Sequence, residues 1–219
     1  MTILPPSLPD PTLDALVRAD HGDPFALLGP HRQGPGEPLL IRAFLPGARD
    51  VLVVEDGRVL AALTPVHPEG VFAGVVPGRF EPFAYRLHGH SGDGSEFQFD
   101  DAYRFPPVLG ELDVHLLAEG NHLEAYERLG AHLREIDGVA GTAFAVWAPN
   151  ARRVSVVGDF CGWDGRRLPM RKRHDCGVWE LFVPGVGAGA RYKFEIKAAS
   201  GALLPLKADP CARAAEHPP

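Results

Sequence analysis

Residues 41–54 read IRAFLPGARDVLVV, and residues 144–157 read FAVWAPNARRVSVV. Each stretch contains an apolar strand, a proline, a turn residue, Ala-Arg and a second apolar strand, and the two are offset by 103 positions. Further along, VFAGVVPG at 71–78 matches VWELFVPG at 178–185, now offset by 107. Matching blocks in the same order predict two tandem copies of one domain of about a hundred residues.

The composition favours short strands joined by many turns. Glycine and proline make up 47 of the 219 residues, about 21% against the ~12% of ordinary usage, which excludes a long-helix or coiled-coil protein. The hydrophobic share of 45% is that of a chain with a real core. In residues 191–197 apolar and charged side chains alternate, and Trp179, Leu181 and Val183 face away from Glu180. This pattern predicts an all-β fold of antiparallel sandwiches with one buried and one wet face.

A helical connector is predicted between the two copies. Asn121 resembles an N-cap with Glu124 three residues later, and Gly130 would end the helix, with a further short turn of helix over 112–118. This is the only helical stretch that we expect. The predicted organisation is therefore an N-terminal extension over 1–20, a first sandwich over 21–106, the connector over 107–138 and a second sandwich over 139–219.

Charge and cysteine usage exclude several classes of protein. The net charge is −6, and residues 1–110 carry 8 basic and 14 acidic side chains. This balance does not provide the cationic surface that nucleic acid requires, and RRLPMRKR at 166–173 is expected to be a solvated hairpin. Three cysteines without CxxC spacing predict neither a disulfide scaffold nor a zinc site. With no signal peptide and no long apolar run, we expect a cytoplasmic protein with no membrane partner.

Motifs that carry chemistry are not apparent. The ten histidines form no HExxH and no ligand-spaced cluster, and the sequence has no GxSxG, no Walker loop and no GxGxxG after a strand. We therefore expect no catalytic residue, no metal and no cofactor in this chain.

The tryptophans carry more information than the histidines. Trp147 and Trp179 fall within alternating strands and are expected in the core. Trp163 lies instead in GDFCGWDGRR, a loop rich in glycine and aspartate, where it either plugs the end of the sandwich or stacks on a sugar ring. Lys193 points outward on a later strand and would supply a hydrogen-bond donor. From these residues alone the two roles of Trp163 stay open.

Several longer blocks resemble a known family. HGDPFALLGPH at 21–31, the connector at 116–132, the stretch at 144–170 and LPLKADPCA at 204–212 are similar to the N-terminal part of bacterial 1,4-α-glucan (glycogen) branching enzymes. The resemblance implies two immunoglobulin-like β-sandwiches, the second a carbohydrate-binding module, ahead of a catalytic (β/α)₈ barrel. The barrel holds the aspartate nucleophile and glutamate acid/base of this retaining chemistry. No catalytic residue carries over, so the chain is expected to be inactive alone, with α-1,4-glucan and the absent barrel as partners.

The resemblance also assigns individual residues. Trp163 matches the loop tryptophan and Lys193 the strand lysine of the binding module, whereas its second stacking tryptophan would fall at 200–204, which here reads SGALL. Cys161 and Cys211 stand where the family usually has Asn and Tyr. One stacking contact predicts a Kd of ~0.1–10 mM. The alternatives are a structural scaffold without glucan binding, or the N-terminus of an isoamylase or trehalohydrolase, relatives that generally lack the tandem first domain.

Overall fold

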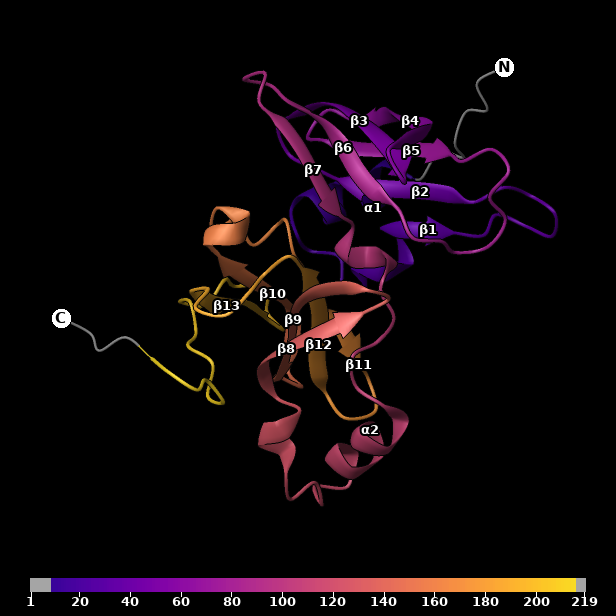
Figure 1. The fold of residues 1–219 in the computed structure, drawn as a ribbon. Coiled ribbons are helices and arrows are strands. Elements are labelled where there is room, and N and C mark those ends of the chain that lie inside the picture. The colour runs from indigo at the N-terminus through magenta and orange to yellow at the C-terminus, as the bar shows by residue number, and fades with distance from the viewer. Residues whose placement is uncertain (1–8, 216–219) are drawn as a thin grey trace. The chain divides into compact units, whose positions relative to one another are not determined.

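The computed structural model describes residues 9–215 and divides into two compact units, the first ending at Phe105 and the second beginning at Pro106 (Figure 1). Residues 1–8 of the predicted N-terminal extension lie outside the described part. The first unit contains α1 (Asp10–Val17), the 3₁₀ turns η1 (Pro24–Ala26) and η2 (Ala102–Arg104), and the strands β1 (Gly29–His31), β2 (Leu40–Phe44), β3 (Ala48–Glu55), β4 (Arg58–His67), β5 (Val71–Val75), β6 (Arg86–Ser91) and β7 (Glu96–Asp100).

The second unit contains α2 (Glu111–Ala118), the 3₁₀ turns η3 (Ala125–Glu127) and η4 (Asp159–Cys161), and the strands β8 (Gly130–Ile136), β9 (Val139–Trp147), β10 (Ala151–Gly158), β11 (Arg171–Arg173), β12 (Val178–Pro184) and β13 (Tyr192–Ala198). Its strands form a sheet of order β11-β12-β9-β8 and a pair β10-β13, whereas the first unit has one sheet of order β1-β2-β5-β4-β3-β6-β7. The predicted all-β class is confirmed. β8 pairs with β9 and belongs to the four-stranded sheet of the second unit. This sheet therefore begins inside the predicted connector, residues 107–138.

The internal repeat is confirmed by strand register. In the first unit Ala43 lies opposite Phe72, and in the second Val146 lies opposite Trp179, at the same offsets of 103 and 107. The pair β3–β6 matches β10–β13 in the same way, and β1–β2 matches β8–β9. The two units thus share a pairing scheme and not merely a strand-like composition.

Each unit is closed by the same tyrosine–aspartate contact. The Tyr85 hydroxyl donates to Asp101 at 2.5 Å, and the Tyr192 hydroxyl donates to Asp209 at 2.5 Å. Burial and the neighbouring carboxylate raise the pKa of both phenols, which therefore stay protonated as donors. The second oxygen of each aspartate accepts a backbone N–H two residues later, from Tyr103 at 3.0 Å and from Cys211 at 2.8 Å.

The strand that begins each copy packs against this contact at a glycine. Gly29 has φ +86°, and a Cβ there would lie 2.5 Å from the carbonyl oxygen of Tyr103. Gly130 has φ +101°, and its Cβ would lie 3.1 Å from the side chain of Cys211. A glycine is therefore required at both positions, for backbone conformation and for close approach.

The expectation of a single helical stretch is wrong, because α1 also forms, within the segment assigned to the N-terminal extension. Leu13, Leu16 and Val17 on its apolar face are buried against a cluster that includes Leu28 and Phe44. Three apolar residues at helical spacing are a short signal, and the packing of the face stabilises the helix.

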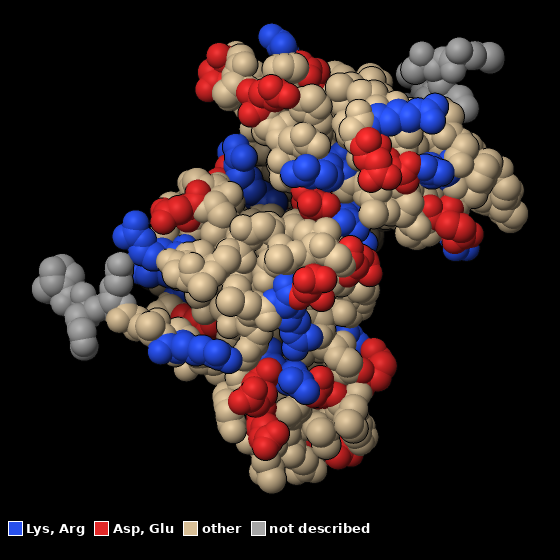
Figure 2. All heavy atoms as spheres, in the orientation of Figure 1, with Lys and Arg blue, Asp and Glu red and all other residues tan. Residues whose placement is uncertain are grey.

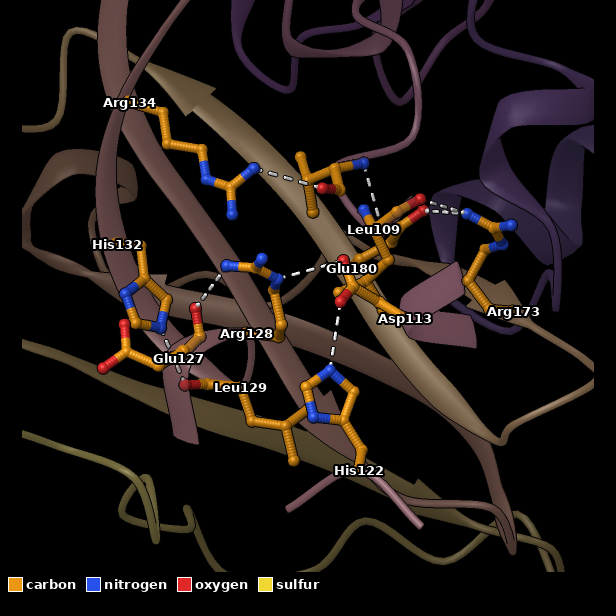
Figure 3. Close-up of polar contacts among 11 residues, drawn as sticks. Leu109, Asp113, His122, Glu127, Arg128, Leu129, His132, Arg134, Arg173 and Glu180 are labelled. Atoms are coloured by element: carbon orange, nitrogen blue, oxygen red, sulfur yellow. Dashed lines mark hydrogen bonds and ion pairs between the residues drawn. The ribbon is translucent and has the colours of Figure 1, made fainter. Parts of the chain in front are cut away.

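The predicted helix over 121–130 is also wrong. Only the 3₁₀ turn η3 forms there, and Leu123 and Tyr126 of the predicted apolar face are 94% and 61% exposed. Leu129 alone of that face packs against the core, which is too little to stabilise a longer helix. Asp113 of α2 accepts hydrogen bonds from His122 at 3.0 Å and Arg128 at 3.0 Å, which tie the loop back to α2 (Figure 3). The shorter helix expected over 112–118 is present as α2.

Glu180 of β12 is fully buried, which corrects the expectation that its face of the sheet is wet. Residues 106–118 cover that face, and Glu180 accepts the backbone N–H groups of Val108 at 3.1 Å and Leu109 at 2.7 Å (Figure 3). Arg173 lies 3.4 Å from the other carboxylate oxygen and donates to Glu111 at 2.7 Å. The basic run at 166–173 is therefore not a simple solvated hairpin, because its last arginine holds α2 to the sheet.

The tyrosine–aspartate contacts give a first prediction. Asp101→Ala leaves the buried Tyr85 hydroxyl and the Tyr103 N–H without their acceptor, which lowers the free energy of unfolding by about 1–3 kcal/mol. Asp209→Ala has an effect of similar size on the second unit, and urea unfolding measures both. Asp93→Ala, in an exposed turn, is the matched control. Loss of less than about 0.5 kcal/mol in both buried variants would contradict this account.

Glu180 gives a second prediction. Glu180→Ala leaves two buried N–H groups and Arg173 without their carboxylate, so we expect the second unit to lose about 3–5 kcal/mol of stability. Thermal unfolding followed by circular dichroism measures the loss, with the exposed Glu135→Ala as control. If both variants melt at the wild-type temperature, the carboxylate does not hold the 106–118 segment.

Candidate functional site

Trp163 lies in the loop 159–170, which leaves the end of β10 and returns at β11. Gly162 and Trp163 have φ +62° and +59°, so the chain turns through two left-handed residues. The backbone N–H of Trp163 donates to the backbone carbonyl of Gly158 at 3.0 Å, which closes this turn. A bulky residue with positive φ is uncommon and strained, and such residues concentrate at functional sites.

The indole ring of Trp163 is both exposed and held. The exposed fraction of the residue is 38%, so part of the side chain is open to solvent. Its Nε1 donates to Asp159 at 2.8 Å, and the other oxygen of Asp159 lies 3.5 Å from Arg191. One edge of the ring is therefore fixed by a carboxylate while the ring keeps contact with solvent.

Lys193 lies at the same end of the β10–β13 pair. It is opposite Val157 in the ladder, and the neighbouring Tyr192 is opposite Gly158, whose carbonyl holds Trp163. Its side chain is exposed on the outer face, as the alternation predicted. The structure thus brings Trp163 and Lys193 to one end of one strand pair, and glucan binding there stays a prediction.

The loop 159–170 packs on a buried ion pair between Arg153 and Glu195. Arg153 is 2% exposed and donates to Glu195 at 2.8 Å and to the Ser155 hydroxyl at 2.8 Å. Gly165 packs directly on this carboxylate, since a Cβ there would lie 1.9 Å from a Glu195 oxygen. The loop therefore crosses the β13 carboxylate at Gly165, and residues 168–170 then run beside β10, where the Met170 N–H donates to the Val154 carbonyl at 2.8 Å.

The segment in which the resemblance would place a second stacking tryptophan, residues 200–204, contains leucines instead. Residues 203–207 run antiparallel beside β13, where Leu203 forms a bridge with Lys197 and Lys207 with Phe194. Residues directly opposite share a face, so Leu203 lies on the outer face with Lys193, and it is 58% exposed. Cys161 packs into the turn beside Gly158, and burial raises the pKa of its thiol.

The prediction that Trp147 lies in the core is wrong, whereas Trp179 is buried as expected. Trp147 is the last residue of β9 and is 61% exposed. The alternating pattern did not reveal this, since the last residue of a strand follows the same alternation whether or not a neighbour covers it.

The structure adds three observations on other ligands. Residues 9–215 bring together no group of three or more His, Cys, Asp or Glu side chains suited to a metal ion. Neither helix in the described part of the chain has the length and apolar character needed to cross a membrane. On the face drawn in Figure 2, basic and acidic side chains are interspersed.

The chain matches two protein families and full-length relatives. Residues 9–103 match the N-terminal domain of alpha-1,4-glucan branching enzyme GlgB, and residues 128–212 match carbohydrate-binding module 48 (isoamylase N-terminal domain). The chain is 58% identical over 207 residues to the 1,4-alpha-glucan branching enzyme GlgB of Paramagnetospirillum magneticum, covering 94% of this chain and 27% of that protein. Against the same enzyme of Cereibacter sphaeroides it is 57% identical over 213 residues, covering 97% and 29%.

The chain thus spans less than a third of the length of these curated relatives. Among solved structures, a pullulanase from Anoxybacillus sp. LM18-11 aligns with 74% of this chain and 23% of its own, at 17% identity and a TM-score of 0.27. The two matched segments, in this order and at this level of identity, show that the chain belongs to the GlgB branching enzyme family, as its N-terminal domain followed by a carbohydrate-binding module 48.

Proposed function

We propose that this chain is a non-catalytic region that binds α-1,4-glucan through Trp163 and Lys193. The observation that carries the proposal is the indole of Trp163, exposed on a left-handed turn and tied by its edge to Asp159. The apolar C–H face of a glucose ring lies flat on such a surface, and Lys193 donates to a hydroxyl at its rim. A ring held in place before binding loses little freedom when the sugar arrives.

The proposal extends to the longer protein in which the relatives carry this region. There the chain holds glucan close to a catalytic barrel that cleaves α-1,4-linked chains and transfers them into α-1,6 branches. Holding the chain raises its effective concentration at the barrel, so weak binding is sufficient. The 219-residue chain itself is expected to leave the iodine–amylose absorbance unchanged, because we assign it no catalytic residue. A falling absorbance with the purified chain would overturn that part of the proposal.

A scaffold role without glucan binding is the second candidate. The segment 200–204 favours it, since it has no aromatic side chain, and its exposed Leu203 on the outer face is aliphatic. In that case the second unit only supports the barrel. Affinity electrophoresis in glycogen gels separates the two, because a scaffold migrates without retardation.

Substitutions around Trp163 test the binding role. Trp163→Ala removes the stacking surface. We therefore expect the variant to be retarded less in glycogen gels, with an apparent Kd about tenfold higher than that of the unsubstituted chain. Asp159→Ala frees the ring and weakens retardation to a smaller extent, whereas Asp159→Asn keeps an acceptor for the indole N–H and retains most of it.

Tyr126→Ala is the matched control, because Tyr126 is an exposed aromatic residue in the loop after α2. It is expected to migrate like the unsubstituted chain. If the unsubstituted chain is retarded and Trp163→Ala is retarded equally, glucan binds elsewhere, and if none of the proteins is retarded, the scaffold role holds.

A further inference from the structure

The loop that follows α2, residues 119–128, exposes two large apolar side chains. Leu123 is 94% exposed and Tyr126 is 61% exposed. The proposed function assigns no role to either residue. Single apolar residues are common on protein surfaces, so their exposure alone does not indicate a function. The indication comes from the way in which the loop is held and from the charges around the exposed pair.

Loop 119–128 is fixed to the second unit on both sides of the exposed pair. Asp113 of α2 accepts a hydrogen bond from His122 at 3.0 Å and another from Arg128 at 3.0 Å (Figure 3). Leu117 before the loop and Leu129 after it pack against a core cluster of the second unit. The loop between these anchors therefore has a defined course.

The order of the loop favours a partner over a purely structural role. Fixing a loop costs conformational entropy, and here the ties hold a segment whose largest apolar side chains, Leu123 and Tyr126, stay in water. Side chains that are fixed before a partner arrives lose little freedom on binding, which increases affinity. Leu123 and Tyr126 are therefore suited to insertion into a pocket of another protein surface.

The charges of the loop indicate which surface that is. Glu119, Glu124 and Glu127 are exposed, and the one arginine of the loop, Arg128, is tied to Asp113. These carboxylates disfavour a phosphate or an anionic membrane surface. A symmetric contact with a second copy would bring like charges together. A protein surface with an apolar pocket rimmed by lysine or arginine complements both the side chains and the charge.

We propose that loop 119–128 is the docking surface for the catalytic barrel of the longer protein. This chain spans less than a third of the length of its curated relatives, so each relative carries a large further part on the same chain. A domain on the same chain is present at high effective concentration, so a contact through two apolar side chains and an acidic rim is sufficient. The inference rests on the part of the proposed function that places a barrel in the longer protein, and it is independent of glucan binding by Trp163.

A chimeric enzyme tests this inference, with the 219-residue chain in place of the matching region of the branching enzyme of Paramagnetospirillum magneticum. Hydroxyl-radical footprinting compares the chimera with the free chain. Leu123 and Tyr126 are expected to be oxidised about tenfold more slowly in the chimera, because a docked surface excludes water. Phe80, which is 49% exposed in the first unit, is the control and is expected to react equally in both proteins. Equal oxidation of Tyr126 in the free chain and in a chimera that branches amylose overturns the inference.

Substitutions separate docking from the fold of the second unit. Leu123→Ser combined with Tyr126→Ser is expected to leave the melting temperature of the free chain within about 1 °C of the unsubstituted value and to lower that of the chimera by about 4 °C. Leu133→Ser, at a leucine of β8 that is 62% exposed, is the matched control and changes neither. Glu124→Lys combined with Glu127→Lys is expected to restore the oxidation of Tyr126 in the chimera, because lysines repel a basic rim.

The outcomes distinguish this inference from the proposed function. If the double serine variant melts well below the unsubstituted free chain, the two side chains serve the fold of this unit, and the inference is wrong whatever the chimera does. Glucan binding by Trp163 is measured on the free chain in glycogen gels, where no barrel is present. An unprotected loop therefore leaves the gel result intact, and a chain that is not retarded leaves the footprint of the loop intact.

Discussion

The buried ion pair between Arg153 and Glu195 is the interaction on which the candidate site depends. Burying two charges costs several kcal/mol, and the Ser155 hydroxyl and the Glu195 backbone carbonyl offset part of this cost by accepting hydrogen bonds from Nη1 of the guanidinium. Gly165 packs on the carboxylate with no room for a side chain, which fixes the loop against β13 at this point. Trp163 lies in the turn between Gly158, at the end of β10, and Gly165. The orientation of the indole is therefore a consequence of buried chemistry below it.

The duplicated architecture explains why the site occurs in one copy. Both units keep the same register and the same tyrosine–aspartate closure, so the scaffold is common to them. In the first unit, β3 turns into β4 through Asp56 and Gly57 alone. In the second unit the equivalent connection is the loop 159–170, which carries Trp163. The candidate glucan surface is thus an elaboration of one turn on a shared sandwich, and the first unit has no tryptophan with which to repeat it.

Sequence patterns predicted what local chemistry determines. The repeat, the all-β class and the outward direction of Lys193 follow from alternation and turn residues, and they agree with the structure, whereas β8 was not predicted. The patterns did not predict features that depend on coverage by distant segments. Glu180 was expected to face solvent but is covered by residues 106–118, whereas Trp147 was expected in the core but is 61% exposed at the end of β9. The left-handed backbone of Trp163 was not predicted, because the pair of glycines around it allowed many turns.

Paired crystal structures of the chain, free and with maltoheptaose, test the central claim that Trp163 is a preformed glucan platform. The account predicts a glucose ring stacked on the indole, with the positive φ of Trp163 and its hydrogen bond to Asp159 present in both structures. A free structure in which the indole packs into the sandwich would contradict it, as would a complex in which the loop 159–170 has rearranged to bind the sugar.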